Sequence, residues 1–152
     1  MKKYLPFALC IAIASWYGCT KDDTIQVKNY QQLLIDKKWQ LTAITTRSAT
    51  GVSVNEFDSL PAYSKDDYFL FKADSTFELN DNIDTMPGSK HSRILDEGTW
   101  ELTSSGDLDM HSDVFNSDYN TAKILELDSK VLRLERRHPG DGSVTTTSYK
   151  SF

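Results

Sequence analysis

The sequence predicts an all-β protein: an eight-stranded antiparallel up-and-down barrel with a short N-terminal helix before it. Three observations lead to this fold class. From Lys38 onward, apolar and polar residues alternate with a period of two in short runs. Turn-forming residues separate most of these runs, and no stretch between them offers the repeated helices that a parallel sheet requires. Eight twisted strands are about the number at which such a meander closes and removes its exposed edges.

The first element, residues 1–18, has the pattern of a secretory signal peptide. Lys2 and Lys3 supply a positive start, an uncharged apolar stretch follows over residues 5–16, and the small Gly18 precedes Cys19. The apolar stretch is too short to span about 30 Å of hydrocarbon. We therefore divide the chain into a signal peptide (1–18), a lipidated Cys with its tether (19–28) and a barrel domain (29–152).

The residues around Cys19 indicate where the protein is anchored. The segment 15–19 resembles a bacterial lipobox, in which the Cys sulfur receives a lipid, so we expect a membrane contact through Cys19. A plain secretory peptide cut nearby is the alternative. Lys21 is followed by two acids, which resembles the surface-export signal of some Gram-negative lipoproteins. This predicts the outer face of the outer membrane, the alternative being a solvated tether on the periplasmic face.

A helix and a strand open the predicted barrel domain. Asn29 is a suitable N-cap, and Tyr30, Leu33 and Leu34 would lie on one face of a short helix over residues 29–35. From Lys38 the period changes to two, which predicts a first strand with one buried face.

The connection after this strand, residues 47–67, is too apolar for a free loop. It contains Phe57, Leu60 and Tyr63, with a helical turn expected around residues 55–60. We expect this connection to fold back over one end of the core, where Phe57 and Tyr63 would lie near the mouth of the barrel.

The other seven strands follow with turns or loops between them. They are predicted at residues 68–71, 76–79, 94–103, 108–110, 122–127, 131–135 and 143–150. Asp74 is expected to take the left-handed conformation of one hairpin turn, and Gly98 to mark a bulge or a bend. Closure requires the last strand to pair with the first. A β-sandwich built from the same strands is the competing fold.

An ordered set of short motifs resembles a known family. The segments 38–41, 66–71, 74–77 and 98–102, followed by paired Leu-rich strands, resemble the lipocalin-like lipoproteins of Gram-negative bacteria. In that family's usual turn a Gly follows the Asp, where this chain has Ser75. The resemblance implies a barrel and a general ability to enclose small apolar molecules, and it names no ligand.

The inward-phased aromatic residues are the best candidates for a functional role. Their first role is core packing, because each buries roughly 150–250 Å² of surface. If a cavity remains, they would line it. The candidate ligand-binding residues, including the two from the long connection, are Trp39, Phe57, Tyr63, Phe69, Phe71, Phe77 and Trp100.

Composition and motifs offer little catalytic chemistry. A net charge of −5 argues against nucleic acid as a partner, and two Cys are too few for a disulfide-rich scaffold. His111, Ser112 and Asp113 are triad residue types, but neighbours on a strand point to opposite faces. The oxygen-rich segments 81–84 and 113–118 lack the spacing of a calcium loop. We predict no enzyme, no cofactor and no metal site.

Two functions remain open from the sequence. The first is an outer-membrane lipoprotein whose barrel binds a small hydrophobic ligand. The second is a non-catalytic envelope module with a filled core, whose loops 47–66 and 81–92 contact another envelope protein or a polysaccharide. The basic residues Lys130, Arg133, Arg136 and Arg137 are expected to lie on the outward face of one strand and its end, where they serve solubility.

Overall fold

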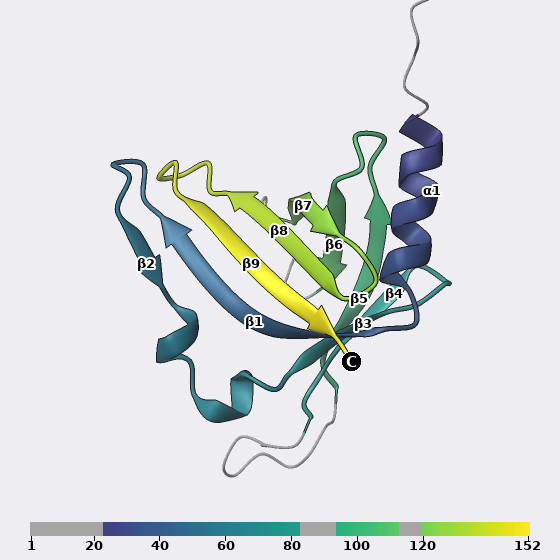
Figure 1. The fold of residues 1–152 in the computed structure, drawn as a ribbon, viewed down its shortest axis with the longest axis horizontal. Coiled ribbons are helices and arrows are strands. Elements are labelled where there is room, and N and C mark those ends of the chain that lie inside the picture. Colours follow the sequence, from purple (N-terminus) through teal and green to yellow (C-terminus); the bar gives the residue numbers. More distant parts are fainter. Residues whose placement is uncertain (1–22, 83–93, 113–119) are drawn as a thin grey trace, which may run out of the picture.

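The structure is a computed structural model that describes residues 23–82, 94–112 and 120–152 (Figure 1). The predicted signal peptide and Cys19 lie outside these residues. The described elements are α1 (Asp23–Leu34), β1 (Lys38–Arg47), β2 (Ser53–Asn55), the 3₁₀ helices η1 (Phe57–Ser59) and η2 (Ala62–Ser64), β3 (Tyr68–Phe71), β4 (Thr76–Asn80), β5 (Ile94–Leu102), β6 (Leu108–Ser112), β7 (Thr121–Leu127), β8 (Val131–Arg137) and β9 (Val144–Ser151).

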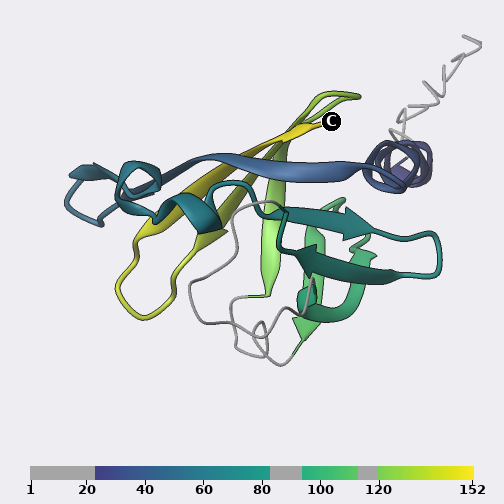
Figure 2. The same cartoon turned by 90° about the horizontal axis from the view of Figure 1, so that it is seen from below.

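The strands form a closed antiparallel barrel, as the sequence predicts. Strands β3 to β9 pair in chain order, and β1 pairs with β3 on one side and with β9 on the other. The pairing of β1 with β9 runs from Trp39 opposite Ser151 to Arg47 opposite Val144, and it closes the sheet. Figure 2 shows β3, β4, β5 and β6 curling away beneath β1. The eight predicted strands correspond to β1 and β3–β9.

One strand was not predicted. β2 pairs with the outer end of β1, Thr45–Arg47, and lies at the edge of the nine-stranded sheet. All three of its residues are exposed, so it carries no alternation of burial that a period-two pattern could reveal. The long connection then forms η1 and η2. The helical turn predicted around residues 55–60 is present as η1.

The N-terminal helix begins earlier than predicted. α1 starts at Asp23, so Asn29 lies within the helix instead of capping it, and residues 23–28 of the predicted tether are helical. The apolar face continues upstream of Asn29 because Val27 falls in phase with Tyr30 and Leu34. An acidic residue at the first position is also favourable for the helix dipole. Among the described residues, no helix is long and apolar enough to cross a membrane.

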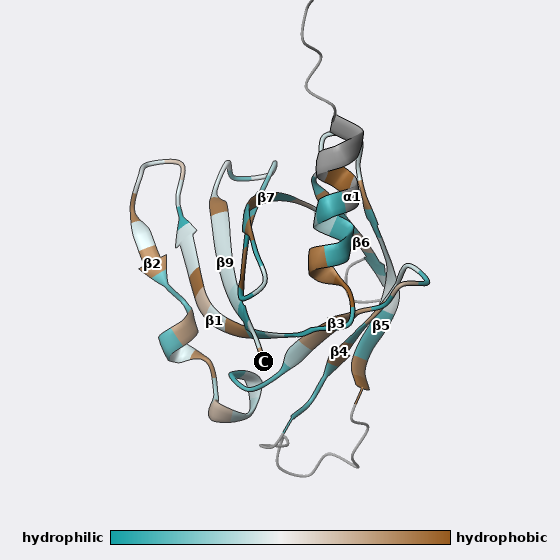
Figure 3. Ribbon diagram, turned by 45° about the vertical axis from the view of Figure 1, so that its right-hand side comes forward, coloured by the Kyte–Doolittle hydropathy of each residue, from teal (hydrophilic) through white to brown (hydrophobic). Residues whose placement is uncertain are grey.

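The core lies where α1 meets the barrel. The side chains of Trp39, Phe77 and Leu34 are 0% exposed, and Phe71 and Trp100 are nearly as buried. Figure 3 shows hydrophobic residues on α1 and β3, whereas β9 is pale over most of its length. The pale stretch reflects the hydroxyl residues 145–148. Strands β8 and β9 still contribute Leu132, Leu134 and Tyr149 to the core.

Two local backbone predictions, one at Gly98 and one at Asp74, differ from the structure. Gly98 is no bulge: it pairs regularly with Phe77 and Ser112, and a Cβ there would collide with the carbonyl of His111. Glycine is needed because two backbones approach closely. In the β3–β4 turn, Ser75 and not Asp74 takes the left-handed conformation, with φ +66°. The Asp74 carboxylate instead accepts hydrogen bonds from the backbone N–H and hydroxyl of Thr76.

Candidate functional site

The barrel has two ends with different coverings. At the closed end, Tyr30 of α1 lies 3.8 Å from the position of a Cβ on Gly106, in the β5–β6 turn. Val27 and Gln31 of the same helix share a hollow of about 180 Å³ with Ser75 and residues 100–102. The open end is at the other side, where β1, β8 and β9 reach the β1–β2 and β8–β9 turns. We call the two parts of the barrel interior the closed half and the open half.

Four of the predicted ligand-binding residues form a packed floor in the closed half. Three of their rings meet edge to face or tilted, with the Phe71 centroid 5.6 Å from that of Trp100 and 6.4 Å from that of Phe77. Both indole N–H groups donate to backbone carbonyls: Trp39 to Leu34 at 2.9 Å and Trp100 to Lys72 at 3.2 Å. Trp39, Phe71, Phe77 and Trp100 are at most 3% exposed. In this conformation they are covered by protein.

Phe69 marks the upper limit of the floor. Its ring centroid lies 5.9 Å from those of Phe71, Phe77 and Tyr149, yet its side chain is only half-buried. Its strand partners Trp39 and Leu79 show that it faces inward, because directly paired residues share a face of the sheet. Phe69 is therefore the predicted aromatic residue that faces the interior and keeps access to solvent.

The inner wall of the open half is polar on the β1–β9–β8 side. Arg136 pairs with Thr145, which pairs with Thr46, and the three share the inward phase of Leu134. The hydroxyl groups of Thr46 and Thr145 are 2.8 Å apart, and Thr145 is also 2.8 Å from Nε2 of His138. The prediction that Arg136 faces outward is wrong. It lies two residues beyond the inward Leu134, and its Nη2 approaches Sδ of Met110 at 3.8 Å.

The segment with Phe57 and Tyr63 bridges a gap in the barrel wall. β1 pairs with β3 only through Lys38–Gln40, and η1 and η2 lie in the connection between the two strands. Gln40 donates to the carbonyl of Lys65 at 3.1 Å, and the Lys65 ammonium lies 5.3 Å from the Phe57 ring centroid. Both aromatic side chains are half-buried. They lie beside the wall, away from the packed floor residues.

The match to a known family comes from the middle of the chain. The family model of the lipocalin-like domain matches residues 35–134, about two thirds of the 152 residues. The chain belongs to the lipocalin-like domain family. A search of curated proteins finds no match. The matched region begins just after α1 and includes β1, the floor, β3 to β7 and the first part of β8, so the lipocalin-like part of the sequence resemblance is confirmed.

The imidazole of His111 in this lipocalin-like barrel does not join Ser112. Its Nε2 lies 3.2 Å from a carboxylate oxygen of Asp109, and its Nδ1 lies 3.1 Å from the amide nitrogen of Asn120. The Ser112 hydroxyl donates to Asp96 at 2.7 Å. The two residues therefore use different partners, as expected for neighbours on a strand. Asp113 and His91 lie outside the described residues.

An acidic cluster at the open end was missed by the sequence analysis. Asp66 and Asp67 precede β3, Asp81 follows β4, and carboxylate oxygens of the three lie within 4.8 Å of one another. Burial, then the charges of Asp81 and Asp66, raise the pKa of Asp67 to about 6. In the sequence Asp81 opens the oxygen-rich segment 81–84, of which 83 and 84 lie outside the described residues. The predicted β3–β4 hairpin was the signal that could have found this cluster.

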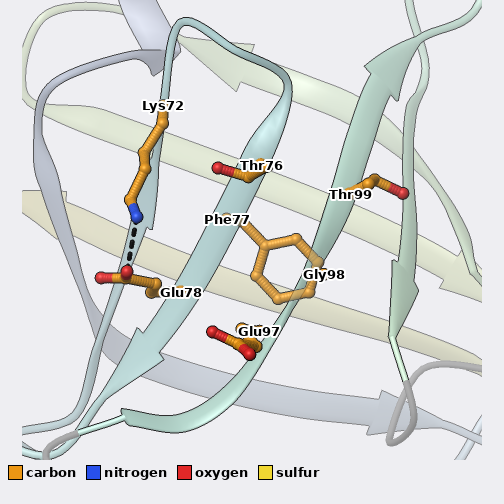
Figure 4. Close-up of a pocket in the computed structure, with 7 residues that line it drawn as sticks. All are labelled: Lys72, Thr76, Phe77, Glu78, Glu97, Gly98 and Thr99. Carbon is orange, nitrogen blue, oxygen red and sulfur yellow. Dashed lines mark hydrogen bonds and ion pairs between the residues drawn. The ribbon is translucent and has the colours of Figure 1, made fainter.

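A second hollow lies on the outer face of the lipocalin-like barrel (Figure 4). It measures about 490 Å³ and is lined by residues of the β3–β4 turn, β4 and β5: Lys72, Thr76, Phe77, Glu78, Glu97, Gly98 and Thr99. Lys72 forms an ion pair with Glu78 across it, which lowers the pKa of Glu78. Phe77 and Gly98 occupy paired positions of β4 and β5 there, and the Phe77 side chain itself stays fully buried. None of these polar residues was predicted as a site.

Proposed function

We propose that this lipocalin-like protein binds a small, mainly apolar molecule in the open half of its barrel and is held at a membrane through a lipid on Cys19. One observation supports the proposal of ligand binding. The inward-facing Leu41, Ile44, Phe69 and Leu79 keep access to solvent, whereas the floor beneath them is fully packed. An apolar ligand resting on Phe69 would cover these side chains and gain the free energy of their burial.

The polar wall suggests the chemistry of the other end of the ligand. Arg136 faces the interior next to Thr145 and Thr46, which places a guanidinium group and two hydroxyl groups on this wall. A guanidinium group binds carboxylates through charge-assisted hydrogen bonds, which are stronger than neutral ones. The ligand class that fits is an apolar body with one acidic or hydroxyl-bearing end.

The position of α1 fits an anchor at Cys19. The helix starts at Asp23, shortly after Cys19 in the chain, and packs at the closed end. A lipid on Cys19 would keep the closed end nearer the membrane and leave the mouth of the barrel toward solvent. With the signal peptide and the Lys-Asp-Asp segment, we propose the outer face of the outer membrane in a Gram-negative bacterium, the periplasmic face being the alternative.

Ligand binding is tested by fluorescence on a protein spanning residues 20–152. Anilinonaphthalene sulfonate, fatty acids and bile acids are titrated while the Trp emission is followed. We expect saturable quenching, with affinity reduced roughly tenfold by Arg136→Gln through loss of the charged contact. Arg137→Gln is the matched control, because that side chain is exposed on the same strand. Absence of saturable binding across the whole panel would reject the ligand proposal.

The anchor is tested separately in cells. Labelled palmitate should be incorporated into the unsubstituted protein and lost in Cys19→Ala. Protease added to intact cells should then digest the protein if it lies on the outer face, and should spare it on the periplasmic face. Label that persists in Cys19→Ala would refute the assignment of the anchor.

A second candidate function has one observation in its favour. Val52 and Val54, in and beside the edge strand β2, are 63% and 55% exposed, which is unusual for two neighbouring apolar side chains. They favour the non-catalytic envelope module, with another envelope protein or a polysaccharide as partner. A photo-crosslinker at Val54 should then yield an adduct in intact cells. No adduct there or elsewhere in residues 47–66 would count against this candidate.

A further inference from the structure

Three carboxylates converge where β3 and β4 reach the open end of the barrel. Tyr68 pairs with Asn80, so Asp67 and Asp81 stand opposite each other just beyond the last pair of the hairpin. Asp66 adds a third carboxylate from the same side as Asp67. One oxygen from each residue lies within 4.8 Å of the others. Two oxygens bound to the same Ca²⁺ are separated by at most about 4.6–5.2 Å, so this spread fits a single ion.

The burial of Asp81 is a second and independent observation. The residue is only 8% exposed, and its Oδ1 is buried without a hydrogen-bond partner. Oδ1 of Asp67 is in the same situation. Buried polar atoms in proteins are nearly always paired, and an ionised carboxylate is among the groups that are most costly to bury alone. Both oxygens therefore require a compensating partner, which a bound cation would supply.

The described residues supply no cationic side chain to Asp67 or Asp81. The salt bridges recorded there involve other acids: Glu78, Asp109 and Glu126. Lys65, the neighbour in sequence, is turned the other way. Its ammonium donates to the carbonyl of Asp58 at 3.2 Å and lies over the Phe57 ring.

We propose that Asp66, Asp67 and Asp81 bind a divalent cation with the preferences of Ca²⁺. The donor set consists of carboxylate oxygens, without the His or Cys that Zn²⁺ favours. Mg²⁺ would require the oxygens to converge further, because its ligands lie about 2.0–2.1 Å from the ion. Water and backbone carbonyl groups would complete the coordination of the larger ion.

A bound cation would join two parts of the barrel mouth. It would connect the end of β4 to the start of β3 and, through Asp66, to the segment that leads from η2. The strands there end at the open half, where the inward side chains are least covered. This proposal does not depend on the ligand proposed above, because it rests on the three carboxylates alone.

The test uses the full chain, freed of metal by a chelator and then dialysed. Calorimetric titration with CaCl₂ should show saturable binding of one equivalent. The thermal midpoint should rise by roughly 5 °C at a Ca²⁺ concentration well above the dissociation constant, and by less with the same concentration of MgCl₂. Asp81→Asn should weaken Ca²⁺ binding roughly tenfold or more, because one of three charged ligands is lost.

Asp36→Asn is the matched control. It makes the same change at an exposed residue near the closed end, with φ +57°, a conformation that Asn tolerates, and should leave Ca²⁺ binding unchanged. In chelator, Asp81→Asn should fold at least as stably as the unsubstituted chain, because repulsion among the carboxylates is reduced. Asp67→Asn serves as a second variant should Asp81→Asn fail to fold. The proposal would be overturned if the protein did not bind Ca²⁺ at millimolar concentration. It would also be overturned if neither variant changed Ca²⁺ binding.

Discussion

The closed and open halves of this barrel are built from the same strands, but their inward-facing side chains differ in size, polarity and burial. In the closed half, the inward residues are large, apolar and fully covered, as Trp39 and Phe77 show. In the open half they include Arg136, Thr145 and half-buried Phe69. The difference teaches that packing is uneven along the barrel: the closed half supplies the buried core, and the open half leaves inward side chains partly exposed, where the proposed ligand would lie.

The largest expected effect compares neighbouring Phe residues on β3. Phe71→Ala removes a ring that is 1% exposed and should lower the free energy of unfolding by about 3–5 kcal/mol. Phe69→Ala should cost roughly half as much, because its ring is only half-buried. Urea unfolding followed by Trp fluorescence measures both. Equal costs would mean that the open half is packed as tightly as the closed half, which would remove the basis of the comparison.

A smaller effect is expected at Gly98, on the boundary of the floor. A Cβ there would collide with the carbonyl of His111 and come within 2.9 Å of Cε1 of Phe77. Gly98→Ala should therefore destabilise the protein by about 2–3 kcal/mol, since one neighbour is backbone and cannot move aside cheaply. Thr99→Ala, at an exposed position next to it, is the control and should cost less than about 1 kcal/mol. A neutral Gly98→Ala would show that the floor is loosely packed.

The two halves also differ in how much could be predicted from sequence. The floor residues Trp39, Phe77 and Trp100 lie at period-two positions, and burial follows directly from that pattern. The inward direction of Arg136 follows from the same phase as Leu134, but a basic residue was assumed to lie outside. The acidic cluster was missed because Asp81 lies in another segment of the sequence than Asp66 and Asp67. Only the register of β3 against β4 brings Asp67 next to Asp81.

Elements without periodic burial were the least predictable. β2 is exposed at all three residues, so nothing in its sequence distinguishes it from a loop. The predicted start of α1 is too late because Asn29 is a favourable N-cap type, whereas the tertiary contact of the helix extends to Val27. In both cases packing against β1 or the closed end, not local propensity, decides the element.

Asp67, at the open end, should give the free energy of unfolding a pH dependence opposite in sign to that of the other acids with shifted pKa values. The pKa of Asp67 is raised from 3.8 to about 6, so its proton is bound more tightly in the folded state. The contribution of Asp67 to the free energy of unfolding is fully present below pH 3.8 and is lost as the pH rises to about 6. In chelator, this should cost on the order of 1–2 kcal/mol after screening of a partly exposed group is allowed for.

Asp67→Asn isolates this effect from the other acids. The pKa values of Asp128 and Asp141 are lowered by hydrogen bonds from backbone N–H groups, so their contributions are lost as the pH falls. The difference in unfolding free energy between Asp67→Asn and the unsubstituted protein should therefore grow in favour of the variant between pH 4 and about pH 6. A difference that stays constant over this range would show that Asp67 has an ordinary pKa.

The smallest expected effect concerns the turns at the closed end. Ser75 adopts φ +66°, where the turns at the open end have Gly51 and Gly142. Ser75→Gly should stabilise the protein by about 0.5–1 kcal/mol, because relief of the left-handed strain exceeds the extra chain entropy that Gly loses. Ser129→Gly, in the turn between β7 and β8 without a positive φ, should be neutral or destabilising. If both substitutions destabilise the protein, the hydrogen bonds from Thr76 to Asp74 compensate the backbone strain at Ser75. The conformation of Ser75 would then cost the folded state no net free energy.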